Sequence, residues 1–131
     1  MTKITLLAGA AALAVMPVLA APALADAAAE ITIAQTHAGA AAKQTTIDAV
    51  HMHLHHVLNC LVGPKGEGFD AAAGNPCAKA GDGAIPGTTD AAAKTKLEAV
   101  VTRVKAGLAT NDLANAKSEA ERAKDALASA K

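Results

Sequence analysis

Histidine side chains gather in one decapeptide of this chain, residues 51–60 (HMHLHHVLNC). Four of the five histidines of the 131-residue sequence lie there, within six positions: His51, His53, His55 and His56. Imidazole is the commonest metal-binding side chain, because its neutral nitrogen is a donor at physiological pH. Sites rich in imidazole and poor in thiolate suit Cu(II), Ni(II) or Zn(II), and affinity alone favours copper. The decapeptide therefore predicts a site for a divalent transition metal.

If this segment is helical, its histidines divide into two groups, because positions three and four apart share one face of a helix. His51 and His55 then flank one side of an apolar stripe centred on Leu54. His53 and His56 lie together on the opposite side. Each group provides only two imidazole ligands, so a stable metal site needs donors from another part of the chain.

The remaining donors must come from outside the decapeptide. His37 is the first candidate, because it is the only other histidine in the chain. It can meet the middle of segment 46–62 if residues 27–44 and 46–62 form a helical hairpin, but not if they form one continuous helix. Four acidic residues are candidate oxygen donors: Glu30, Asp48, Glu67 and Asp70.

Other interpretations of the histidine cluster stay open. The side chains could form a solvated polar flank of the helix or a pH-sensitive patch. They could also ligate haem between facing helices of a bundle. The chain has no C-x-x-C-H attachment motif and almost no aromatic residues to line a haem pocket, which disfavours haem.

The two cysteines, Cys60 and Cys77, have sixteen residues between them. In an exported protein we expect such a pair to form a disulfide. The alternative is that both thiolates ligate Cu(I) or zinc together with His53 or His56, which requires reducing conditions. With the disulfide formed, the intervening segment becomes a flap beside the histidine helix, and we expect Phe69 to be its hydrophobic plug.

Four segments have helical periodicity and caps: about 27–44, 46–62, 89–108 and 111–130. The second is the best patterned, with apolar residues three and four apart at Ile47, Val50, Leu54, Val57, Leu58 and Leu61. On this segment Met52 and Asn59 are predicted to point away from the stripe. Residues 63–88 hold seven glycines and three prolines and predict an irregular loop.

These elements predict an all-α fold: an up-and-down four-helix bundle with a disulfide-tied, Gly/Pro-rich loop. Neither glycine nor proline separates the first two helical segments, so three helices are the alternative. The stretch Thr45-Thr46-Ile47-Asp48 can restart a helix at this point, because a threonine is followed three residues later by an acid.

Residues 1–25 have the features of a cleaved signal peptide. After a positively charged start, Ile4–Val15 is an apolar run, and Ala23-Leu24-Ala25 is a small-x-small cleavage site. No later run is long enough to span a bilayer. We therefore expect residues 26–131 to form a single helical domain in the periplasm, without stable membrane insertion.

Composition disfavours several classes of function. The hydrophobic fraction is 52%, but most of it is alanine, which buries little area. Phe69 is the only aromatic residue, so the chain lacks the platforms on which nucleic-acid bases stack. The net charge is zero, or −1 without residues 1–25, and offers nucleic acid no basic surface. No nucleophile elbow, phosphate-binding glycine loop or H-E-x-x-H motif is present, so we expect no enzymatic activity.

Three alanine-rich stretches carry a resemblance to a known family: Leu97-Glu98-Ala99-Val100, Ala116-Lys117-Ser118-Glu119-Ala120 and Ala123-Lys124-Asp125-Ala126-Leu127. Together with His37 and the 51–56 cluster, they resemble the small periplasmic metal-binding proteins, which are alanine-rich helical bundles with histidines along their faces. The resemblance lies mainly in the last forty residues. It implies sequestration of copper or another divalent metal, without catalysis.

The leading hypothesis is a periplasmic protein that sequesters or buffers a divalent transition metal, copper first and then zinc or nickel. Its expected ligands are five histidines: His37, His51, His53, His55 and His56. Metal ions are its expected partners, and a homodimer could complete the site. The alternatives are a disulfide-stapled structural or interaction domain without metal and, less favoured, a haem-binding bundle.

Overall fold

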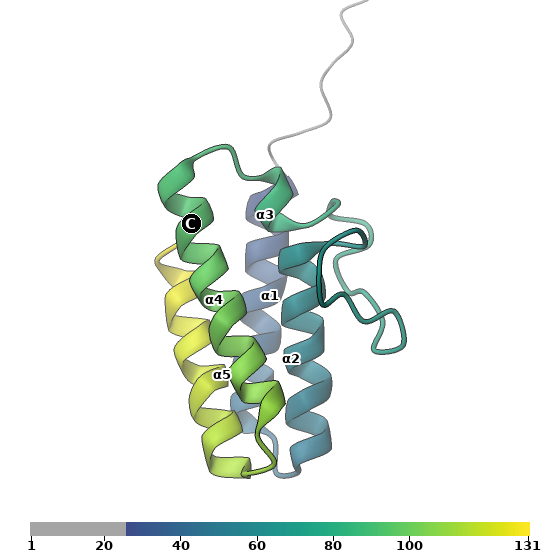
Figure 1. The fold of residues 1–131 in the computed structure, drawn as a ribbon, viewed down its shortest axis with the longest axis vertical. Helices are drawn as coiled ribbons and strands as arrows, with labels where there is room; N and C mark the ends of the chain where they lie inside the picture. Colours follow the sequence, from purple (N-terminus) through teal and green to yellow (C-terminus); the bar gives the residue numbers. More distant parts are fainter. Residues whose placement is uncertain (1–25) are drawn as a thin grey trace, which may run out of the picture.

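The computed structural model describes residues 26–131. This part of the chain contains five helices, joined by links and a loop, and no strand. The helices are α1 (Asp26–Lys43), α2 (Ile47–Val62), α3 (Ala84–Gly87), α4 (Ala91–Ala109) and α5 (Leu113–Ala128). The four long helices form a bundle, in which α1 packs against α2 and α5, and α4 packs against α5 and α2 (Figure 1). The all-α class predicted from the sequence is confirmed, whereas the predicted signal peptide lies outside the described residues.

None of the helices in this range is both long enough and apolar enough to cross a membrane.

The first two helices are separate, which decides between the four-helix and three-helix alternatives. Helix α1 ends at Lys43, and α2 begins at Ile47. Thr46 caps α2, because its hydroxyl accepts a hydrogen bond from the N–H of Ala49 at 3.3 Å. The short link lets α1 fold back along α2, so that residues far apart in the sequence lie opposite one another.

Aspartates fix the starts of the last two long helices. Asp90 accepts from the N–H of Ala93 at 2.7 Å, and Asp112 accepts from the N–H of Asn115 at 2.7 Å. These caps place the helix starts about two residues later than the sequence pattern indicated, because Asp90 and Asp112 are the N-caps and the helices begin after them.

The predicted apolar stripe of α2 forms the centre of the core. Five of its six residues are buried: Val50, Leu54, Val57, Leu58 and Leu61. Opposite them, α1 presents alanines such as Ala34 and Ala38, which are fully buried. Gly107 in α4 allows a close approach, because a Cβ there would lie 2.7 Å from the Cδ1 atom of Leu54. Small residues on the facing helices therefore bring their backbones close to α2.

The segment predicted as an irregular loop, residues 63–88, contains the short helix α3, so that prediction is wrong for its last part. Helix α3 forms there because its apolar residues dock on the bundle: Ala84 is buried, and Ile85 packs against the core. Glycine is required at Gly83, where φ is 118° and a Cβ would lie 2.7 Å from the N atom of Gly63.

The disulfide between Cys60 and Cys77 is confirmed, with Cα atoms 5.2 Å apart. Both cysteines are therefore unavailable as thiolate ligands. Between positions 64 and 82, the only buried residue is Cys77. The loop is thus attached to the bundle by one covalent link and by polar contacts, rather than by an apolar core of its own.

The prediction that Phe69 plugs the flap is wrong. Phe69 is only half-buried and is not among the residues packed against the core. The loop instead covers Asn59 of α2, which is fully buried and hydrogen-bonded to it. Polar contacts with the α2 surface replace the apolar contact expected from the one aromatic side chain.

Candidate metal centre

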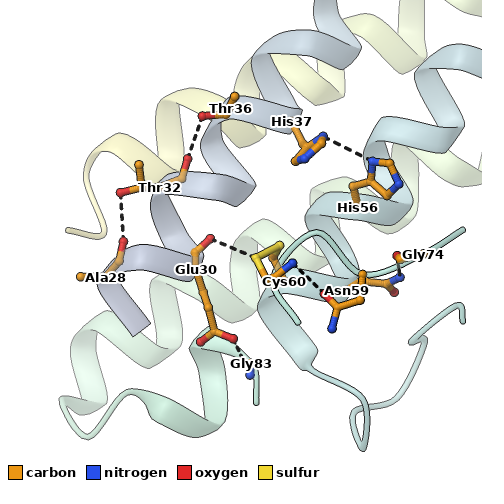
Figure 2. Close-up of a disulfide and its surroundings, with 12 residues drawn as sticks. Ala28, Glu30, Thr32, Thr36, His37, His56, Asn59, Cys60, Gly74 and Gly83 are labelled. Carbon is orange, nitrogen blue, oxygen red and sulfur yellow. Dashed lines mark hydrogen bonds between the residues drawn. A yellow bond between two sulfur atoms is a disulfide. The ribbon is translucent and has the colours of Figure 1, made fainter. Parts of the chain in front are cut away.

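Three histidines from two helices converge on one point of the bundle. His37 of α1 has its Nδ1 atom 3.1 Å from Nδ1 of His53 and 3.3 Å from Nδ1 of His56, both on α2. One ligand nitrogen from each ring lies within 4.8 Å of the others. Figure 2 shows His37 and His56 facing each other across the two helices. All three side chains are half-buried, so the cluster lies at the edge of the core.

The hairpin of α1 and α2 positions these side chains. His53 and His56 are three apart and share one face of α2, as the helical spacing predicted. His37 lies between the buried positions Ala34 and Ala38 of α1, whose small side chains let the two helices approach closely. The imidazole of His37 therefore reaches both rings on α2.

The ring of His56 is also held from the loop. Its Nε2 atom lies 2.8 Å from the carbonyl oxygen of Ala73. Because a carbonyl oxygen can only accept, Nε2 of His56 carries the hydrogen and donates it. In the neutral ring the lone pair is then on Nδ1, which faces His37. This is the arrangement of a metal-binding histidine, whose second nitrogen donates to a carbonyl or carboxylate.

Burial and neighbouring histidines keep the rings of His37 and His53 neutral. The pKa of His37 is lowered from the usual 6.5 to about 4, mainly by burial and further by the charges that His56 and His53 would carry when protonated. The pKa of His53 is also lowered, first by burial and then by His56. Since only a neutral imidazole donates to a metal, these two rings have the required protonation state at neutral pH.

The separations suit a transition metal. A tetrahedral ion about 2.05 Å from each nitrogen places neighbouring donor atoms about 3.3 Å apart. The two Nδ1–Nδ1 distances that involve His37 are 3.1 and 3.3 Å. Three imidazoles with one further coordination position, for water or another donor, fit Zn(II), Cu(II) or Ni(II).

The structure does not bring His51 and His55 into this cluster. The Nε2 atom of His51 donates to the carbonyl oxygen of Thr110, the C-cap of α4, at 3.0 Å. The Nδ1 atom of His55 lies 3.5 Å from a carboxylate oxygen of Asp70. This nitrogen is buried, and apart from that contact it has no hydrogen-bond partner. The five predicted histidines therefore separate into one three-membered cluster and two individual side chains.

The candidate oxygen donors lie elsewhere. Glu30 is buried, and its carboxylate accepts from the N–H of Gly83 at 2.7 Å (Figure 2). Glu67 is exposed and pairs with Lys105. Within residues 26–131, the cluster that could hold an ion consists of the three imidazoles alone.

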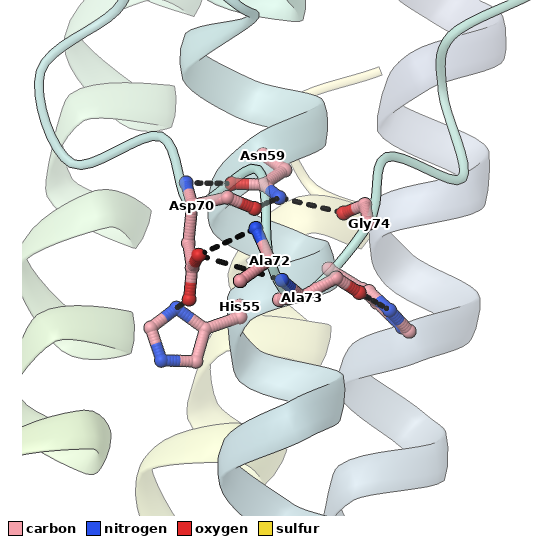
Figure 3. Close-up of polar contacts among 7 residues, drawn as sticks. His55, Asn59, Asp70, Ala72, Ala73 and Gly74 are labelled. Carbon is pink, nitrogen blue, oxygen red and sulfur yellow. Dashed lines mark hydrogen bonds and ion pairs between the residues drawn. The ribbon is translucent and has the colours of Figure 1, made fainter.

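Asn59 is a residue of the site region that sequence reasoning missed. It was predicted to point away from the apolar stripe together with Met52, and only Met52 does so, since the residue is 47% exposed. Asn59 is fully buried beneath the loop. Its amide bonds to the backbone of Asp70 and Gly74 (Figure 3). An asparagine one turn beyond His55 gives no sequence signal for this role, because its partners lie in an irregular loop.

A comparison of this chain with family models, with curated proteins and with solved structures finds no match. The candidate metal centre is therefore defined by its geometry and chemistry.

Proposed function

We propose that this protein is an exported, up-and-down four-helix bundle that binds one divalent transition-metal ion through His37, His53 and His56. Its role is to sequester or buffer the ion in the periplasm, without catalysis. The observation that supports this best is the convergence of three Nδ1 atoms from two helices, at separations of 3.1 and 3.3 Å for the two pairs that include His37.

Copper(II) is the first candidate ion, followed by zinc and nickel. The three donors are all imidazole nitrogens, and at such a site Cu(II) has the highest affinity of the common divalent ions. The half-buried position of the rings supports buffering, because solvent reaches the site and ions can exchange. The same geometry disfavours haem, since nitrogens 3.1 Å apart leave no room for a macrocycle between His37 and His53.

Calorimetric titration with Cu(II), Zn(II) and Ni(II) at neutral pH tests the proposal. We expect saturable binding of one ion per chain. Loss of an outer hydrogen-bond partner of a metal ligand weakens metal binding about 10–100-fold. Replacing one of the ligands itself, as in His53→Ala, should weaken binding at least as much. His51→Ala and His55→Ala are matched controls on the same helix and should bind like the wild type.

Three results of this titration would each have a distinct meaning. Absence of saturable binding of all three ions would overturn the proposal. Equal losses in His51→Ala and His53→Ala would place the ion outside the cluster. One ion per two chains would show that a homodimer completes the site with donors from a second copy.

A further inference from the structure

A buried amide holds both ends of one loop turn. The Nδ2 atom of Asn59 donates to the carbonyl oxygens of Asp70 and Gly74, each at 2.7 Å. Its Oδ1 atom accepts from the N–H of Asp70 at 2.8 Å. All three hydrogen bonds reach the turn formed by residues 70–74, as Figure 3 shows. Asn59 therefore fixes where this turn lies relative to α2.

The same turn provides the hydrogen-bond acceptor for His56. Ala73 lies between the two carbonyls that Asn59 holds, and its own carbonyl accepts from Nε2 of His56 at 2.8 Å. Asp70 tightens the turn from within, because its Oδ1 atom accepts from the N–H of Ala72 at 2.9 Å. A displaced turn would take the Ala73 carbonyl away from Nε2 and leave the ring free to change tautomer.

Apart from the bonds of Asn59 and His56, the side-chain contact between α2 and this turn is the 3.5 Å approach of His55 Nδ1 to the Asp70 carboxylate. None of the residues 70–74 is buried, and the one buried side chain of the loop, Cys77, lies three residues beyond the turn. The polar contacts of Asn59 are therefore the main link between the turn and α2. Removing them changes the position of Ala73 without touching any imidazole.

We propose that Asn59 is a positioning residue of the metal site, which acts on His56 through the 70–74 turn. By holding the Ala73 carbonyl against Nε2, it keeps the hydrogen on that nitrogen and the lone pair of Nδ1 directed at the cluster. The effect on metal affinity rests on the proposed function. The effect on the tautomer of His56 concerns the metal-free protein and does not depend on it.

The test uses Asn59→Asp, which keeps the size of the side chain but loses both donated hydrogen bonds. Ring nitrogen-15 NMR signals of the metal-free protein report which nitrogen of each histidine carries the hydrogen. We expect Nε2–H at His56 in the wild type and a mixture of tautomers in Asn59→Asp. His51, whose Nε2 is bound to Thr110, is an internal control and should not change. Zinc affinity should fall about 10–100-fold.

Two further variants keep the test decisive. Asn75→Ala removes a hydrogen bond to the N–H of Cys77 in the same loop but outside the turn, so both readouts should match the wild type. If Asn59→Asp does not fold, Gly74→Ala replaces it. Gly74 has a φ of 85° and nothing within 4 Å of the added Cβ, so this change strains the turn alone.

An unchanged His56 tautomer in the folded turn variant, with wild-type zinc affinity, would overturn the inference. So would an equal effect in Asn75→Ala, since any damage to the loop would then have the same result. If the wild type binds no ion, the proposed function fails. The ring signals, which need no metal, would still decide whether Asn59 sets the tautomer of His56.

Discussion

The Nδ1 atoms of His37 and His53 lie 3.1 Å apart, with one ring on α1 and the other on α2. Two neutral imidazoles can share one hydrogen at this distance, but two protonated rings would repel each other. The pair is therefore suited either to a hydrogen bond or to a metal ion that replaces the shared hydrogen. The proposed metal binding depends on this contact, and the burial of the His37 ring at it should make the fold sensitive to acid.

The stability of the metal-free protein should fall as the pH decreases from about 6.5 to about 4. In this interval His37 takes up a proton in the unfolded chain, where its pKa is near 6.5, but not in the fold, where burial lowers its pKa to about 4. Proton uptake by the unfolded state alone lowers the free energy of unfolding. Urea unfolding at a series of pH values measures this loss.

In His37→Ala the loss of stability over this interval should be smaller, because the buried ring is gone. Met52→Ala, which changes an exposed and uncharged side chain of α2, should keep the wild-type dependence. Identical pH profiles for His37→Ala and the wild type would show that His37 does not resist protonation in the fold. Comparing variants removes the contribution of carboxylates, which also titrate near pH 4.

Removing the disulfide by Cys60→Ser with Cys77→Ser should lower the free energy of unfolding by about 3 kcal/mol, because the loop between the cysteines is no longer closed in the unfolded chain. The two cysteines are 17 positions apart, and both are buried in the fold. Thermal or urea unfolding of the oxidised wild type and the double variant gives the difference. Alkylation of the unfolded wild type without prior reduction would contradict the disulfide itself.

Glu30 should contribute to stability as a buried acceptor. The residue is 1% exposed, and its carboxylate accepts from the N–H of Gly83 next to α3. Glu30→Ala leaves this N–H without its acceptor and should cost about 1–3 kcal/mol. Glu30→Gln keeps an oxygen acceptor and should cost less.

The matched control for Glu30 is Glu67→Ala, which removes a carboxylate that is 95% exposed and paired with Lys105. We expect that change to cost less than about 1 kcal/mol, because exposed ion pairs contribute little. Equal losses in Glu30→Ala and Glu67→Ala, measured by urea unfolding, would be inconsistent with a structural role for the buried carboxylate.

Local periodicity was enough to predict the parts of the site that one helix determines. Spacings of three and four placed His53 and His56 on one face of α2 and His51 with His55 on another. The apolar stripe through Leu54 followed from the same rule and is buried. The disulfide followed from the cysteine count together with the predicted export.

Contacts between distant segments were harder to predict. Whether His37 meets the cluster depended on a break between α1 and α2 that no glycine or proline marks, and only the possible restart at Thr45-Thr46-Ile47-Asp48 indicated it. Asn59 is buried under the loop although it was expected to point away, and Phe69 does not fill the place expected for it. The reason is that the loop pairs its backbone groups with the buried amide of Asn59 instead of covering an aromatic ring. Such irregular backbone has no periodicity from which its contacts can be derived.

Nitrogen-15 NMR of the five imidazoles during a zinc titration gives the most direct test of the metal centre. We expect the Nδ1 signals of His37, His53 and His56 to shift together and to saturate at one ion per chain. The ring signals of His51 and His55 should stay at their metal-free positions. Saturable shifts at His51 or His55, with the three Nδ1 signals unchanged, would contradict the proposed site.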